Sequence, residues 1–204
     1  MTDKSKLVLS EEEQQLVNNA AWILTKRKII DKVNILFGEL IVKMKAHLFA
    51  EIQYLPEEVI NSVPKIAKGE NYLQLPYVLL DYPRCFDKEN IFAVRTMFWW
   101  GNFFSCTLHL SGSYKKEFEL ALQHNIAALQ KNKFYICTNK DEWQHHFELE
   151  NYLPVDQLAE EEIKNIILQQ PFIKVAAKFS LHQWKEINVL LEKCFSDVLH
   201  LLKY

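Results

Sequence analysis

Hydrophobic residues near the N-terminus recur with the period of an α-helix. The apolar positions that repeat every seven residues are Leu16, Ile23, Ile30, Phe37 and Met44. Seven residues make almost two helical turns, so these side chains share one face of a helix. Ser10 followed by Glu13 forms a capping box, which marks a helix start. We therefore expect a long helix from about residue 10 to residue 50, and residues 25–28 are where it could break.

A second apolar stripe lies at the end of the chain. Its members, spaced alternately by three and four residues, are Trp184, Ile187, Leu191, Cys194, Val198 and Leu201. Ser180 and Gln183 make another capping box in front of it. The pattern predicts a C-terminal helix that packs along a seam.

Between these helices the pattern is typical of short strands and helices. Aromatic and β-branched residues predict strands over residues 75–82, 97–110 and 172–179. Within residues 97–110, Gly101 marks either a bulge or a hairpin turn. Alternating apolar and polar residues predict a hairpin made of residues 134–138 and 142–149. Helices are expected over residues 87–96, 113–131 and 156–170. In the last strand, Lys174 and Lys178 alternate with apolar residues and are expected to face solvent.

Helices that alternate irregularly with hairpin-like strands favour an α+β fold. We expect a single mainly antiparallel sheet packed by helices, with a long N-terminal helix and a C-terminal helix. The chain has 204 residues, of which 49% are hydrophobic, and this is enough for one core. Residues 1–204 are therefore expected to form a single domain, in which residues 1–9 are a disordered tail.

Glycine and cysteine usage exclude several kinds of site. Only four glycines occur, each more than ten residues from the next, so neither the dinucleotide-binding fingerprint nor a P-loop is present. No cofactor is expected. The four cysteines have no CxxC spacing and are expected to be reduced thiols. The sequence shows no signal-peptide pattern and no uncharged apolar stretch of about 18 residues, so we expect a cytoplasmic protein without membrane contact.

Aromatic residues are concentrated in residues 70–110, which hold ten of the 26 in the chain. Such a cluster is either the core of a sheet or the wall of a ligand pocket. Arginine makes the second interpretation specific, because only three of the 24 basic residues are arginine and two of these lie in the cluster. A guanidinium group can bind a carboxylate or phosphate through two parallel hydrogen bonds. We predict a pocket for a small anionic or aromatic ligand, with binding residues Tyr77, Arg84, Arg95 and Trp99.

Each of these arginines also has an internal explanation. Arg84 could pair with Asp81, or Arg95 with Glu89, and either ion pair would only fix a loop. A rival hypothesis is a metal-dependent enzyme, in which Asp81, His109 and His145 form a His/His/carboxylate site. His145 lies among apolar residues, where a histidine bonded to the backbone is the simpler explanation. A third hypothesis is a structural or accessory protein with no small-molecule ligand.

Charge is distributed unevenly along the chain. Residues 26–45 hold six basic and two acidic residues, whereas residues 141–162 hold eight acidic and no basic ones. Nucleic-acid binding usually combines a basic stripe with more arginine than is present here, so no nucleic-acid partner is expected. Complementary patches of this kind can dock two chains. A homo-oligomer through the 10–50 helix is compatible with the pattern.

Overall fold

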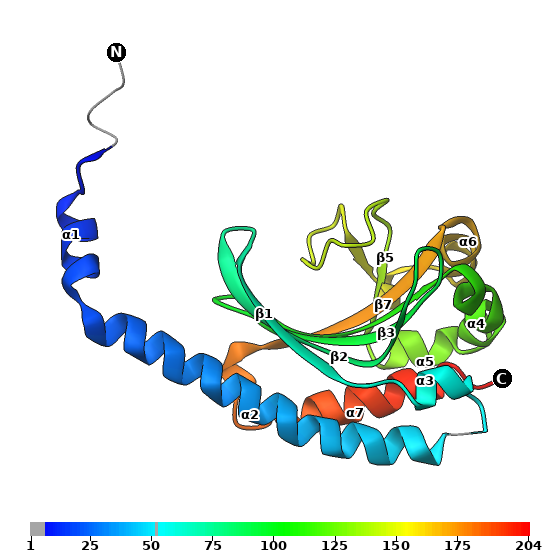
Figure 1. Cartoon of the computed structure of the whole chain (residues 1–204). Helices are drawn as coiled ribbons and strands as arrows, with labels where there is room; N and C mark the ends of the chain where they lie inside the picture. The colour runs from blue at the N-terminus through cyan, green and yellow to red at the C-terminus, as the bar shows by residue number, and fades with distance from the viewer. Residues whose placement is uncertain (1–6, 52) are drawn as a thin grey trace.

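The computed structural model describes residues 7–51 and 53–204. It confirms the predicted α+β fold: these residues form one seven-stranded antiparallel sheet with helices packed against it (Figure 1). Of the predicted tail, residues 1–6 lie outside the described residues, and residues 7–9 are exposed. None of the described helices is long and apolar enough to cross a membrane.

The helices and strands follow one another along the whole described chain. The helices are α1 (Glu11–Asn18), α2 (Ala20–Ala50), α3 (Glu57–Ile60), α4 (Gly112–His124), α5 (Ile126–Lys131), α6 (Glu160–Gln169) and α7 (Ile187–His200). The strands are β1 (Lys65–Tyr72), β2 (Leu75–Phe86), β3 (Ile91–Trp99), β4 (Phe103–Ser111), β5 (Tyr135–Cys137), β6 (Tyr152–Pro154) and β7 (Phe172–Ser180). Their order across the sheet is β1-β2-β3-β4-β7-β5-β6. Short 3-10 turns, η2 (Val155–Gln157) and η3 (Leu181–Gln183), precede α6 and α7.

The long N-terminal helix is present, but it breaks at Asn19 and not at residues 25–28. The Ser10–Glu13 capping box begins α1 as predicted, with the Glu13 amide donating to Ser10 Oγ. The Asn19 side chain accepts a hydrogen bond from the amide of Trp22 and so caps the start of α2. Asparagine competes for backbone hydrogen bonds in this way, which is why the helix restarts there.

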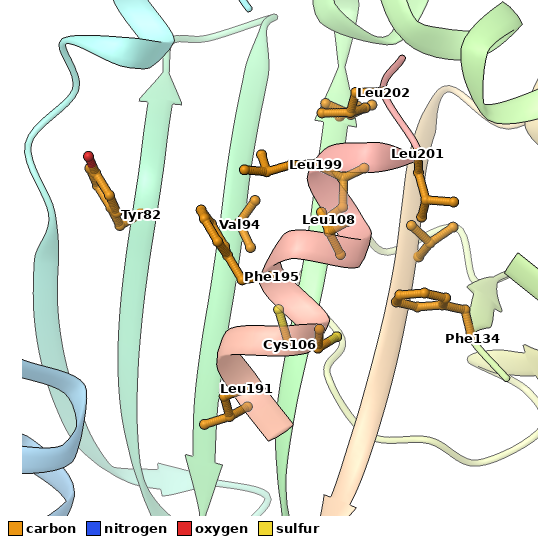
Figure 2. Packing of buried hydrophobic residues seen from close by; sticks show 14 of the residues in the cluster. Tyr82, Val94, Cys106, Leu108, Phe134, Leu191, Phe195, Leu199, Leu201 and Leu202 are labelled. Carbon is orange, nitrogen blue, oxygen red and sulfur yellow. The ribbon is translucent and has the colours of Figure 1, made fainter. Parts of the chain in front are cut away.

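One face of the sheet carries the main core. Even-numbered residues of β3 and β4 point to this face, and α7 packs over it, running roughly along the strands (Figure 2). Phe195 of α7 is fully buried there, together with Val94 and Leu108. Apolar burial of this kind stabilises by about 25 cal/mol per Å². The helix α2 packs beside α7 and along β2, so both long helices cover the same face.

In the middle of the chain one predicted element is wrong and one strand was missed. Residues 87–96 were expected to be helical, but β3 begins at Ile91. The carboxylate of Asp87 accepts hydrogen bonds from the backbone amides of Glu89 and Asn90. These bonds close a tight turn between β2 and β3, at the place where a helix start was predicted. The strand β1 was not predicted, because its polar sequence at the sheet edge shows little alternation.

The predicted hairpin is also different in the structure. The strand β5 pairs with β6, which was not predicted, and residues 138–151 form an irregular segment between them. The apolar alternation in that segment does not mark a buried strand face, since Trp143 is 47% exposed and Leu149 is 72% exposed. The predicted helix 113–131 is interrupted at Asn125, whose side chain donates to the carbonyl of Ala121.

Candidate functional site

The second face of the sheet carries aromatic residues and a group of enclosed polar side chains, Asp81, Arg95, His109 and Lys174, which we call the polar layer. Residues 138–151, which we call the cover segment, pack over it. Arg95 of β3 lies opposite Asp81 of β2, and the two form a bidentate ion pair. Arg95 Nε is 2.7 Å from Asp81 Oδ1, and Arg95 Nη2 is 2.8 Å from Asp81 Oδ2. The remaining nitrogen, Nη1, is 3.1 Å from Nε2 of His145 in the cover segment. The guanidinium group is therefore occupied by groups of the same chain.

Two further buried groups bind the cover segment from β4 and β7. His109 Nε2 lies 2.9 Å from Glu142 Oε2. Lys174 donates to the carbonyl oxygens of Glu142 and Gln144, at 2.8 Å and 2.6 Å. The prediction that Lys174 faces solvent is wrong, because its residue is only 1% exposed. A buried charge must be hydrogen-bonded to offset the loss of its hydration, and the two backbone carbonyls supply these hydrogen bonds to the ammonium group.

Burial shifts the pKa values in this polar layer. It lowers the pKa of His109 to about 3, and the positive charges of Lys174 and Arg95 add to the effect. The pKa of His145 is lowered well below its ordinary value for the same reasons. Burial also lowers the pKa of Lys174 to about 8 and raises the pKa of Glu142. Both histidines are therefore neutral at neutral pH.

Tyr72 binds the backbone in the middle of the cover segment. Its hydroxyl oxygen accepts the backbone amides of His145 and His146, at 2.6 Å and 3.1 Å. The backbone carbonyl of Tyr72 also accepts a hydrogen bond from Nε1 of Trp99, at 3.2 Å. Trp99 is thus a buried structural contact between β3 and the end of β1, and its ring packs edge-on against Tyr72.

The four predicted binding residues share this face but do not line one cavity among the described residues. Tyr77 lies opposite Trp99 in the β2–β3 register, and its ring packs against Gly69 and Tyr72. Arg84 lies beyond an irregularity in β2, with its guanidinium 5.8 Å from the ring centre of Phe86. Arg95 does form an internal ion pair, as the alternative interpretation expected, but its partner is Asp81 and not Glu89. Tyr77 is the one of the four that borders a sizeable groove.

The alternative metal set is not assembled in the described part of the chain. Both carboxylate oxygens of Asp81 bind Arg95, His145 faces the same guanidinium, and His109 faces Glu142. Across residues 7–51 and 53–204, no group of three or more His, Cys, Asp or Glu side chains is placed to hold a metal ion. The four cysteines, which all lie in these ranges, are free thiols.

A groove runs between α2 and the edge hairpin formed by β1 and β2. It consists of a cavity of about 610 Å³ and an adjoining one of about 320 Å³, which share Lys26, Glu70 and Pro76. The larger cavity is lined by Ile23, Lys26, Arg27, Ile30, Asp31, Lys68, Gly69, Glu70, Pro76 and Tyr77. The smaller cavity adds Trp22, Gln74, Leu75 and Trp100. Figure 1 shows the two elements that form the groove, with α2 passing beneath β1.

The charges in this groove are unevenly paired. Lys26 forms an ion pair with Glu70 across the groove. Arg27 and Lys68 make no ion pair with any described residue, so two cationic side chains are available there. Arg27 is the third of the three arginines. Arginine is as rare at this position as at Arg84 and Arg95, but Arg27 lies in a predicted helix outside the aromatic cluster.

Comparison with protein-family models, with curated proteins and with solved structures finds no match to this chain.

Proposed function

We propose that the protein is a binding module for a small molecule that combines an acidic group with a planar apolar part. The ligand lies in the groove between α2 and the β1–β2 hairpin. The observation that carries the proposal is the free guanidinium of Arg27 in a groove that also has a tryptophan-lined end.

The size of the groove supports a ligand of this kind. Its larger cavity, about 610 Å³, falls within the range of roughly 300–1,000 Å³ that is usual for small-molecule sites. Ile23, Ile30 and Pro76 provide apolar walls beside the cationic groups. An acidic group bound by Arg27 can make two parallel hydrogen bonds, and Lys68 adds a second positive charge nearby.

The smaller cavity of the groove suits the planar part of the ligand. Trp22 and Trp100 both line it, and Trp22 is 51% exposed. An aromatic ring that packs between these side chains is removed from water and contributes area-dependent stabilisation.

The lining favours binding over catalysis. Among the described lining residues there is no histidine, cysteine, serine or threonine, so the groove holds no pair of nucleophile and histidine base. The buried histidines His109 and His145 are not among the lining residues; they contact Glu142 of the cover segment and the Arg95 guanidinium.

Isothermal titration calorimetry with three probes tests the proposal. Indole-3-carboxylate carries both parts of the predicted ligand, indole carries the planar part alone, and acetate carries the acidic part alone. We expect indole-3-carboxylate to bind more tightly than either fragment.

The matched variants are Arg27→Gln and Arg84→Gln. A hydrogen bond to a charged group contributes about 1.5–3 kcal/mol, so Arg27→Gln should weaken indole-3-carboxylate binding roughly tenfold to hundredfold. Arg84→Gln should leave the affinity unchanged. Equal affinity in wild type and Arg27→Gln, or no binding of the carboxylate probe, would overturn the assignment of the groove.

A further inference from the structure

The outer face of α2, on the side away from the core, has the pattern of a coiled-coil seam. Its positions alternate by four and three residues: Leu24, Lys28, Asp31, Ile35, Gly38, Val42, Lys45 and Phe49. All eight residues are exposed. The three large apolar residues of its C-terminal half, Ile35, Val42 and Phe49, are 64%, 70% and 72% exposed. Positions of this spacing face the partner helix in a coiled coil. Three of the eight positions are charged, and the exposed apolar residues at the others mark an interaction surface.

From this seam we infer that two copies of the chain associate through the outer faces of their α2 helices. The two helices run antiparallel, with the two-fold axis beside Gly38. This inference goes beyond the proposed ligand site. The two surfaces adjoin each other, because Asp31 and Trp22 also line the groove.

Gly38 is the first argument for a second helix at this position. Glycine in the interior of a helix is less favourable than alanine. A Cβ atom at Gly38 would meet no atom within 4 Å, so nothing in the described chain requires glycine there. The close approach of a second helix backbone would require it, because only glycine leaves room at a crossing point.

The charges along the seam favour a second copy in the antiparallel direction. Asp31 and Lys45 lie seven residues before and after Gly38, and neither forms an ion pair within the described part of the chain. An axis at Gly38 places Asp31 of each copy opposite Lys45 of the other, with Ile35 and Val42 packed between. The parallel arrangement would instead oppose like charges at Lys28, Asp31 and Lys45, which is unfavourable.

The N-terminal part of the chain extends the same surface. The seam from residue 24 to residue 49 is about 38 Å long at 1.5 Å per residue. The helix α1 has no buried residue, and it projects beyond the sheet (Figure 1). In the antiparallel arrangement, Trp22 and Leu24 of one copy reach the exposed Phe49 and Tyr54 of the other. The pairing therefore covers apolar residues at both ends of the seam.

Sedimentation equilibrium of the full chain and of four charge variants tests the inference. We expect the wild type to form dimers. Asp31→Lys and Lys45→Asp each replace two attractive contacts with two repulsive ones, and each should raise the dimer dissociation constant about tenfold. The double variant Asp31→Lys/Lys45→Asp should restore it to near the wild-type value. Lys116→Asp, on the exposed side of α4, is the matched control and should have no effect.

Gly38→Leu separates association from folding. In the monomer the larger side chain meets open space and favours the helix, so the thermal midpoint of the diluted protein should not fall. At the crossing point it separates the two helices, so the dissociation constant should rise more than tenfold. A wild type that stays monomeric at its highest soluble concentration would overturn the inference. So would charge variants that behave like Lys116→Asp, or a double variant that shows no recovery.

Discussion

Acidification from pH 7 to pH 5 is expected to destabilise the polar layer through its buried histidines. His109 is 5% exposed, and burial lowers its pKa to about 3. In the unfolded chain its pKa returns to about 6.5. Between these two values the unfolded state binds more protons than the folded state, so the free energy of unfolding falls as the pH falls.

The size of the effect follows from these two values. At pH 5 the unfolded histidine is almost fully protonated and the folded one is not. His109 alone should therefore lower the free energy of unfolding by about 2 kcal/mol between pH 7 and pH 5. His145 acts with the same sign, because its pKa is also lowered by burial. The carboxylates with lowered pKa values, Asp87 and Asp141 among them, act mainly below pH 4. Glu142, which contacts His109, has a raised pKa and acts with the opposite sign near pH 5, so it reduces the net effect in the wild type.

Urea unfolding at a series of pH values measures the effect. The wild type should lose stability steeply between pH 6.5 and pH 5, and His109→Gln should remove about 2 kcal/mol of this pH dependence. His182→Gln, in which an exposed histidine is replaced, is the control and should retain it. A free energy of unfolding that is constant from pH 7 to pH 5, or a slope unchanged in His109→Gln, would refute the account of the polar layer.

Two further substitutions test other contacts by the same unfolding measurement. Asp81→Ala leaves the buried guanidinium of Arg95 without its carboxylate and should lower the free energy of unfolding by about 3–5 kcal/mol; a loss below 1 kcal/mol would show that the pair is not needed. Gly112 has a φ of +59°, and a Cβ at this position would lie 2.3 Å from the backbone oxygen of Glu89. Gly112→Ala should therefore lower the free energy of unfolding by more than about 1 kcal/mol. An unchanged free energy of unfolding would contradict the geometry of this turn.

Local sequence patterns predicted the fold class and the two long helices well. The apolar period of seven residues in α2 and the capping box at Ser10 depend only on neighbours within two turns, and both appear in the structure. Residues 172–179 also follow a local alternation and form β7. Elements of this kind can be predicted because their stabilising contacts are near in sequence or lie on one regular face.

The features that were missed depend on contacts that are distant in sequence. Lys174 alternates in sequence with apolar residues, which is the pattern of a solvent-facing lysine. It is buried because the cover segment packs over β7 and its backbone carbonyls accept hydrogen bonds from the ammonium group. The apolar alternation of residues 142–149 suggested a strand, but Tyr72, 73 residues before His145, binds the backbone that would have paired with another strand. The two arginines in the aromatic segment were the most visible candidates, yet the guanidinium in the groove is that of Arg27.

The most direct test of the proposed ligand site is an NMR titration of the isotope-labelled chain with indole-3-carboxylate. We expect the amide shift changes to concentrate in residues 22–31, 68–77 and 100, the segments that line the groove. Changes concentrated in the cover segment and around Arg95, or no changes at saturating probe, would contradict the placement of the ligand between α2 and the β1–β2 hairpin.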